Sequence, residues 1–269
     1  MTWDAIVPAL AARRIFVIGN GPSRRRESLQ DLRERFRPER IIACNAAAFE
    51  GPCDAAVAYD AEQIQRILSE TDVPLLVPGS KEQAAQGALS RAPERRRQNP
   101  HLYLIQPHEA NCHLPDDWTP DRPRGHVSGL LAYCLALRAC ARVSCAHARR
   151  EEEEDDVAQN VARRATCATI LLTGMDCAVE PLSEQQALRT CQPDGTPGYR
   201  RTKEFDLRRT IPVDDATMPR AWEPQRNAWR GMSTWGEANG IRTLRSLAYG
   251  ALTFLPVFGE SSWSTAEPG

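Results

Sequence analysis

Polar side chains follow several short apolar runs of the sequence, each close to the point where the run ends. Asn20, Asn45, Asp60 and Asp176 all occupy such positions. Amides and carboxylates form hydrogen bonds with the hydroxyl groups of nucleotides, and a carboxylate also serves as a general base. Ligands of open parallel sheets bind beyond the carboxyl ends of the strands. The spacing therefore predicts that these side chains share one ligand site.

The first apolar run leads into the turn Gly19-Asn20-Gly21-Pro22-Ser23. Glycine adopts backbone conformations that other residues avoid and lets a ligand approach the main chain. A helix after the turn, expected over Arg24–Phe36, offers free N–H groups and a partial positive charge to a phosphate. The alternative is a tight strand-to-helix turn, capped by Ser23 and without a ligand. The pentapeptide matches neither the phosphate-binding P-loop nor the GxGxxG fingerprint.

Candidate catalytic groups come from two places. Asp60 follows the apolar run Ala55–Tyr59 and is a candidate base, although aspartate also caps helices and Ala61–Leu68 is expected to be one. His126 precedes the expected helix at Ser128 and titrates near neutral pH. The alternative for His126 is a loop residue without a ligand.

A basic segment offers candidates for binding phosphate. Arg200, Arg201 and Lys203 follow the Pro/Gly-rich stretch Pro193–Gly198. Cationic groups stabilise a leaving phosphate, and a mobile loop that carries them can close over a nucleotide. A solvated basic loop with no ligand is the other interpretation. No cysteine–histidine spacing typical of zinc is present, and we expect no metal site.

The elements that must position these residues alternate along the chain. Strands are expected over Ile15–Ile18, Arg40–Cys44, Ala55–Tyr59, Pro74–Val77, Leu102–Ile105 and Thr169–Leu172. Helical patterns lie between them, including a small-residue helix over Val127–Ala141 that begins at Ser128-Gly129. Trp222, Trp229 and Trp235 recur at a spacing that fits the buried face of one further helix. This alternation predicts an α/β, Rossmann-like fold with a mostly parallel sheet and helices on both faces.

Length and composition set the remaining bounds. The 269 residues fit a single nucleotide-binding domain over 1–258, with an acidic insertion at about 146–165 and a flexible tail over 259–269. The net charge of −1 gives no global field that attracts nucleic acid or membranes. The nine cysteines include no CxxC pair, and we expect reduced thiols in a cytoplasmic protein. We expect no membrane span.

Four features, taken in order, resemble the bacterial sialyltransferases that use CMP-sialic acid. They are the GNGPS turn, the pair Cys44-Asn45, Ser128-Gly129 at the start of a small-residue helix, and the turn Thr173-Gly174-Met175-Asp176. Their order and rough spacing match over about residues 13–180. The resemblance implies a Rossmann-like fold with a site for a cytidine nucleotide. It assigns nucleotide contacts to Asn20, Gly21, Ser23, Asn45, Ser128, Gly129, Gly174 and Asp176.

The resemblance implies a glycosyltransferase-like enzyme that moves a sugar from a nucleotide-sugar donor, of CMP type, to an acceptor. The acceptor class stays open and includes saccharides and phage-type modified nucleic acid. The donor is a substrate, and no cofactor is expected to be required. The chain has Cys177-Ala178 where the family has tyrosines, and it has no histidine after His147, where the family places its catalytic histidine.

Two alternatives therefore remain. The resemblance extends to a wider group with GPS turns that includes a pterin diphosphokinase-like family and phage-encoded relatives. The first alternative is an ATP-dependent diphosphokinase in which Asp60 and Asp176 hold Mg²⁺. The second is a non-catalytic nucleotide-binding protein.

Overall fold

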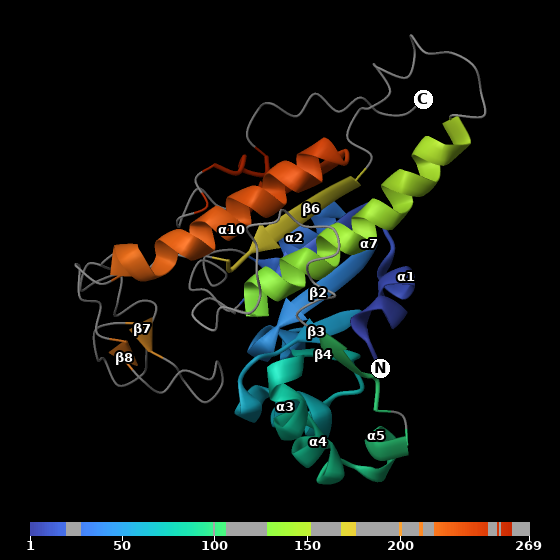
Figure 1. Ribbon diagram of the computed structural model, residues 1–269, viewed down its shortest axis with the longest axis vertical. Coiled ribbons are helices and arrows are strands. Elements are labelled where there is room, and N and C mark those ends of the chain that lie inside the picture. Colours follow the sequence, from blue (N-terminus) through green and yellow to red (C-terminus); the bar gives the residue numbers. More distant parts are fainter. Residues whose placement is uncertain are drawn as a thin grey trace.

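A seven-stranded sheet runs through the middle of the structure, and all of its strands are parallel (Figure 1). In spatial order the strands are β5 (Leu102–Ile105), β4 (Leu75–Pro78), β3 (Ala55–Val57), β2 (Arg40–Cys44), β1 (Arg14–Ile18), β6 (Ala168–Thr173) and β9 (Ile241–Arg245). A separate antiparallel pair consists of β7 (Tyr199–Arg200) and β8 (Thr210–Ile211). The computed structural model describes residues 1–19, 28–98, 100–105, 128–151, 168–175, 199–200, 210–211, 218–246, 252 and 254–259.

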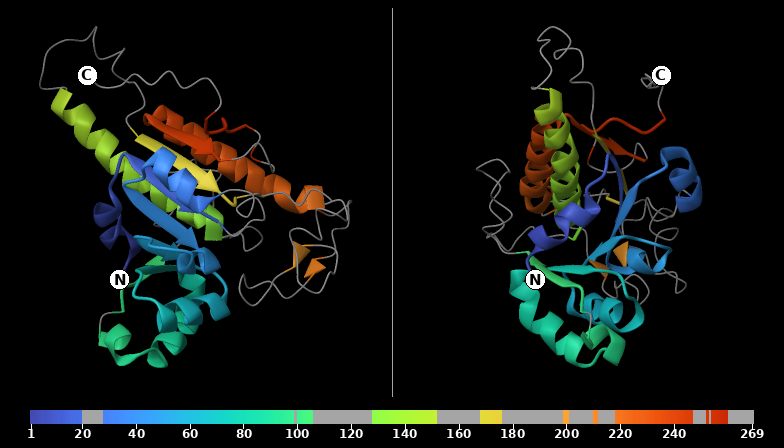
Figure 2. Two further views of the ribbon diagram at one scale, coloured as in Figure 1. Left: turned by 180° about the vertical axis from the view of Figure 1, so that it is seen from behind. Right: turned by 90° about the vertical axis from the view of Figure 1, so that its right-hand side faces the viewer.

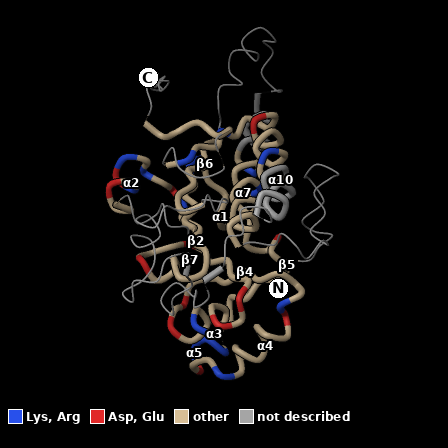
Figure 3. Tube along the Cα trace, turned by 90° about the vertical axis from the view of Figure 1, so that its left-hand side faces the viewer, with Lys and Arg blue, Asp and Glu red and all other residues tan. Residues whose placement is uncertain are grey.

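Helices cover both faces of the sheet, which confirms the α/β, Rossmann-like fold (Figure 2). One face carries α1 (Val7–Leu10), α7 (Ser128–Glu151) and α10 (Met218–Ala238). The other face carries α2 (Leu29–Phe36), α3 (Ala61–Glu70) and α4 (Glu82–Ser90). The remaining short elements are η1 (Trp3–Ala5), η3 (Asn45–Phe49), η4 (Gly79–Lys81) and α5 (Glu94–Gln98). Basic and acidic residues are interspersed along α2 and α3, whereas α5 carries three consecutive arginines after Glu94 (Figure 3).

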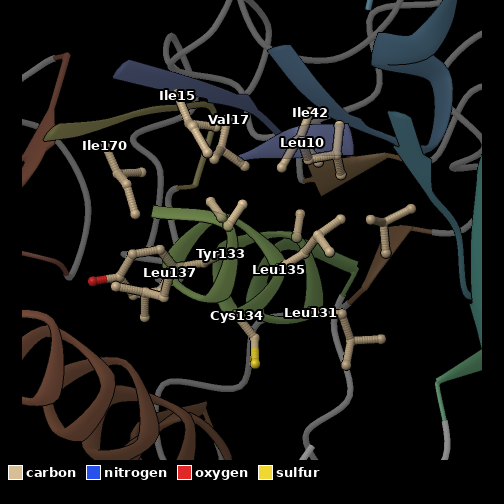
Figure 4. Close-up of a cluster of buried hydrophobic side chains, with 14 of the residues drawn as sticks. Leu10, Ile15, Val17, Ile42, Leu131, Tyr133, Cys134, Leu135, Leu137 and Ile170 are labelled. Atoms are coloured by element: carbon tan, nitrogen blue, oxygen red, sulfur yellow. The ribbon is translucent and has the colours of Figure 1, made fainter. Parts of the chain in front are cut away.

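Successive side chains of β1 enter different hydrophobic cores, because side chains alternate across a strand. Ile15 and Val17 join the hydrophobic cluster between the sheet and α7, which Figure 4 shows in close-up. Phe16 and Ile18 join the cluster on the α2 face. A strand covered on both faces must be apolar throughout, which explains the uninterrupted run of the sequence.

The direction in which the chain crosses the sheet reverses at β1. From β1 the chain builds β2, β3, β4 and β5 on one side, and after α7 it returns to build β6 and then β9 on the other side. Open α/β sheets bind ligands beyond the carboxyl ends of the strands at such a reversal. In sheets of this kind, a ligand would lie at the carboxyl ends of the strands that here are β1 and β6.

The helix after the first strand begins later than the sequence pattern predicts. We expected a helix over Arg24–Phe36, but α2 begins at Leu29, and Ser28 has an extended backbone and accepts a hydrogen bond from the N–H of Asp31 (3.1 Å). The prediction that Ser23 caps this helix is therefore wrong. The amino end of α2 does not follow the glycine turn directly and gives no support for phosphate binding there.

Three further elements differ from expectation. Strand β3 ends at Val57 rather than Tyr59, and α7 continues past Ala141 to Glu151, into the segment expected as an insertion. Strand β9, over Ile241–Arg245, was not expected from the sequence.

Two further findings concern the environment of the chain. Among the described residues, Cys44, Cys53, Cys134 and Cys140 are free thiols. In that same part of the chain, no helix has both the length and the apolar composition that crossing a bilayer requires.

Candidate functional site

The two glycine turns contact each other at the carboxyl ends of β1 and β6. The N–H group of Gly19 donates a hydrogen bond to the carbonyl oxygen of Thr173 (2.8 Å), which extends the ladder between these strands by one bond. A Cβ atom on Gly19 would collide with the carbonyl oxygen of Gly174, and Gly174 has a φ of 64°. Glycine is thus required at both positions so that the turns can approach each other.

Asn45 and Ser128 meet at the same edge of the sheet. Asn45 follows β2 directly, and its φ of 50° lies in the left-handed region, which asparagine tolerates better than most residues. Ser128 is the first residue of α7, and its hydroxyl donates to the amide oxygen of Asn45 (3.2 Å). The structure therefore brings together two residues that the resemblance assigns to nucleotide binding.

Met175 fills the space between the end of β1 and the start of α7. Its sulfur lies 2.6 Å from the position that a Cβ atom on Gly129 would take, and 2.7 Å from the corresponding position on Gly19. Real Cβ atoms do not come this close to a neighbour, so both glycines make room for the thioether. The absence of a side chain at Gly129 thus serves the packing of Met175 in this structure.

Trp229 and Tyr133 form a stacked pair behind Gly129. Their ring centroids are 5.0 Å apart and the planes differ by 11°. The hydroxyl group of Tyr133 shares a hydrogen bond with Thr243 (2.7 Å) and a further one with Ser233, and burial raises the pKa of this phenol. Both rings are fully buried. The spacing of the tryptophans predicted Trp229 on a buried helix face, which the structure confirms.

Asp60 lies beyond the carboxyl end of β3 and is the N-cap residue of α3. Its backbone is extended, as expected for a cap, but its side chain accepts no hydrogen bond from the first turn. The interpretation of Asp60 as a helix cap therefore lacks its defining bond.

Gln63 occupies the first turn of the same helix and is fully buried. Among the described residues, neither its amide oxygen nor its amide nitrogen has a hydrogen-bond partner. Arg66, one turn further along α3, lies 4.2 Å from the ring centroid of Phe49 in η3. Residues three apart share a helix face, so Gln63 lies on the side of α3 that packs against η3.

Two polar residues of this edge were missed by the sequence analysis. Lys81 follows β4 in η4, and its ammonium nitrogen lies 4.5 Å from the ring centroid of Tyr59, the neighbour of Asp60. Ser246 follows β9, and its hydroxyl donates to the hydroxyl of Thr173 (3.0 Å). The signal for Lys81 was its position four residues after the expected strand Pro74–Val77. The signal for Ser246 was missing because its strand was not predicted.

The described part of the chain contains Asn45, Asp60, Ser128, Gly129 and Gly174 among the predicted site residues, together with the backbone of Arg200, which pairs with Thr210. The other candidates lie outside the described residues; they are Asn20, Gly21, Ser23, His126, Asp176, Arg201 and Lys203.

The arrangement combines an amide and a hydroxyl one strand away from the reversal of strand order, a carboxylate beyond β3 and an ammonium group beyond β4. Such groups can orient a polar ligand and remove a proton from a hydroxyl. Within the described ranges, no group of three or more His, Cys, Asp or Glu residues is placed to hold a metal ion. Comparison of the chain with protein families, with curated proteins and with solved structures gave no match.

Proposed function

We propose that this chain binds a nucleotide at the carboxyl ends of β1, β2 and β6 and transfers a sugar from a nucleotide-sugar donor of CMP type. The observation that carries the proposal is the contact between Asn45 and Ser128 beside the reversal of strand order. Two residues far apart in sequence converge there with polar groups at the position where this class of sheet receives its ligand.

In the proposed reaction, an acceptor hydroxyl attacks the anomeric carbon of the donor sugar. Asp60 takes the hydroxyl proton, a new carbon–oxygen bond forms, and the bond between the sugar and the nucleotide phosphate breaks. The nucleotide leaves with the bonding electrons as a charged phosphate. Hydrogen-bond donors and cations at this edge stabilise that charge as it develops. Arg200, Arg201 and Lys203 are the proposed cations, and His126 is the alternative base.

The nucleotide contacts follow from the same placement. The amide of Asn45 is suited to the hydroxyl groups of a ribose, since it offers both a donor and an acceptor. Asn20, Gly21, Ser23 and Asp176 complete the proposed site by their positions in the two glycine turns. Under this proposal the acceptor class remains to be found by experiment.

A binding screen with CMP, UDP, ADP and ATP, each with and without Mg²⁺, tests the proposal. Binding of CMP without Mg²⁺, followed by turnover of a CMP-sugar, is the expected result. Binding of ATP that requires Mg²⁺ would favour the diphosphokinase instead. Nucleotide binding without turnover of any donor would indicate a non-catalytic nucleotide-binding protein, and no binding at all would reject the proposal.

A further inference from the structure

The indole N–H group of Trp229 is a buried hydrogen-bond donor that has no acceptor among the described residues. The residue is fully buried, and among the described residues the nitrogen has no partner. Stacking on Tyr133 fixes the plane of the ring, because the hydroxyl of Tyr133 is itself held by Thr243. A buried donor without an acceptor costs free energy. An acceptor supplied by a ligand would remove this cost.

The indole of Trp229 lies beside the first turn of α7. The Cζ2 atom of Trp229 lies 3.7 Å from the position of a Cβ atom on Gly129, and Cζ2 and the indole nitrogen are bonded to the same ring carbon. The first turn of a helix has backbone N–H groups without intrahelical acceptors and a partial positive charge. The first turn of α7 contains no acidic residue. The indole N–H group and the backbone N–H groups of this turn together favour the binding of an anionic oxygen.

The side chain of Met175 occupies the neighbourhood of these donors. It touches both Gly19 and Gly129, and 9% of the residue is exposed to solvent. Methionine has an unbranched, flexible side chain that adapts to different surroundings. The thioether can therefore move aside for a bound group more readily than a branched side chain in the same place.

We propose that Met175 fills an anion site in the unliganded chain, and that a phosphate group displaces it to accept hydrogen bonds from the Trp229 indole and the first turn of α7. The inference rests on the proposed function in one respect, that the phosphate belongs to the bound nucleotide. It assigns to α10 a role in ligand binding that the sequence pattern gave only to core packing.

The indole N–H resonances of the 15N-tryptophan-labelled protein test this directly. The chain has six tryptophans, and Trp229→Phe identifies the resonance of Trp229 by its loss. Trp3 provides a matched control, because its indole nitrogen is also buried and without a partner among the described residues, while its ring lies against Arg138 further along α7. We expect CMP to move the Trp229 resonance downfield and to leave the Trp3 resonance in place.

Affinities of the variants supply the second measurement. Trp229→Phe should weaken CMP binding about tenfold or more, as expected for the loss of a hydrogen bond to a charged group, and should leave the affinity for cytidine unchanged. Trp3→Phe should leave both affinities unchanged. Met175→Ala should tighten CMP binding, since no side chain has to be displaced.

The outcomes separate this inference from the proposed function. CMP binding with an unmoved Trp229 resonance would overturn the anion site and leave the nucleotide site intact. If the wild type binds no nucleotide, the proposed function fails, and inorganic pyrophosphate becomes the probe. Movement of the Trp229 resonance by pyrophosphate would then support the anion site by itself, and its absence would reject that site too.

Discussion

The hydroxyl group of Ser128 donates a hydrogen bond to the amide oxygen of Asn45, across 83 positions of sequence. The contact joins the start of α7 to the end of β2, one strand away from the reversal of strand order. It also orients the amide of Asn45, which lies at the carboxyl ends of the strands. A polar contact in this place is what a site for a polar ligand requires, and the predictions below follow from it and from its neighbours.

The packing of Met175 predicts a rescue experiment. Gly129→Ala should lower the free energy of unfolding by about 1–3 kcal/mol, because the new methyl group overlaps the sulfur of Met175. In the background of Met175→Ala the same change should cost at least about 1 kcal/mol less. Urea unfolding of the four proteins in this cycle gives the coupling energy.

Gly19→Ala is the control for that cycle. Its methyl group would also meet the carbonyl oxygen of Gly174, which is backbone and cannot be removed by mutation of Met175. We therefore expect Met175→Ala to rescue Gly129→Ala but not Gly19→Ala. Equal rescue of both would show that the clash with Met175 is not what restricts Gly129.

The buried amide of Gln63 predicts a stabilising substitution. Gln63→Leu should raise the free energy of unfolding by about 1–2 kcal/mol, because an unsatisfied amide is replaced by an apolar side chain of similar size. Gln65→Leu is the matched control on the same helix; its exposed amide oxygen accepts from Arg91 (3.3 Å), and the change should stay within about 0.5 kcal/mol. A destabilised Gln63→Leu protein would mean that the amide has a partner, such as a buried water.

The sequence predicted most of the sheet but not the chemistry of its contacts. Six apolar runs located six of the seven strands, because strands buried on both faces are apolar throughout. Strand β9 was missed since arginine and threonine separate its two apolar residues, so that no apolar run marks it. Serine occurs at both 23 and 28, and the local pattern did not distinguish which one caps α2.

In the candidate site, too, the sequence predicted the positions of residues but not their contacts. Asn45 and Asp60 were found because they follow apolar runs, and Ser128 because of a resemblance. The isolation of Gln63 was not predictable, since Asp60 and Gln63 have the spacing of a capping box, in which both side chains would be satisfied. The reason for a glycine at 129 lies in Met175, which is distant in sequence and close only in the folded chain.

Burial of Cys134 predicts a pH dependence of stability. Burial raises the pKa of this thiol from 9.0 to about 12. Between these values the unfolded chain loses the proton and the folded chain keeps it, so this contribution to stability is complete below pH 9 and is lost as the pH rises. The free energy of unfolding of the wild type should therefore fall faster above pH 9 than that of Cys134→Ala, by up to about 1.4 kcal/mol per pH unit. Parallel profiles from urea unfolding at pH 8, 9 and 10 would contradict the expected burial.

Asp60→Asn should lower turnover of the nucleotide-sugar by about 10²–10⁴ with little change in donor affinity, because it removes the proposed base and keeps the shape of the side chain. Glu62→Gln, two positions along the chain and exposed, should leave turnover unchanged. Steady-state kinetics with separate measurement of donor binding checks both. Wild-type turnover in Asp60→Asn would exclude Asp60 as the base and leave His126 as the candidate.

The affinity of Asn45→Gly for CMP, measured by calorimetry, tests the central claim most directly. Glycine accepts the left-handed backbone at this position and removes only the amide. Arg37→Gly is the matched control, because Arg37 has the same φ of 50°. Arg37 is the C-cap residue of α2 and precedes β2, whereas Asn45 follows it. The account predicts that the wild type and Arg37→Gly bind CMP equally, and that Asn45→Gly binds it about tenfold more weakly or worse. Equal affinity in all three proteins, or no CMP binding by the wild type, would contradict a nucleotide site at Asn45.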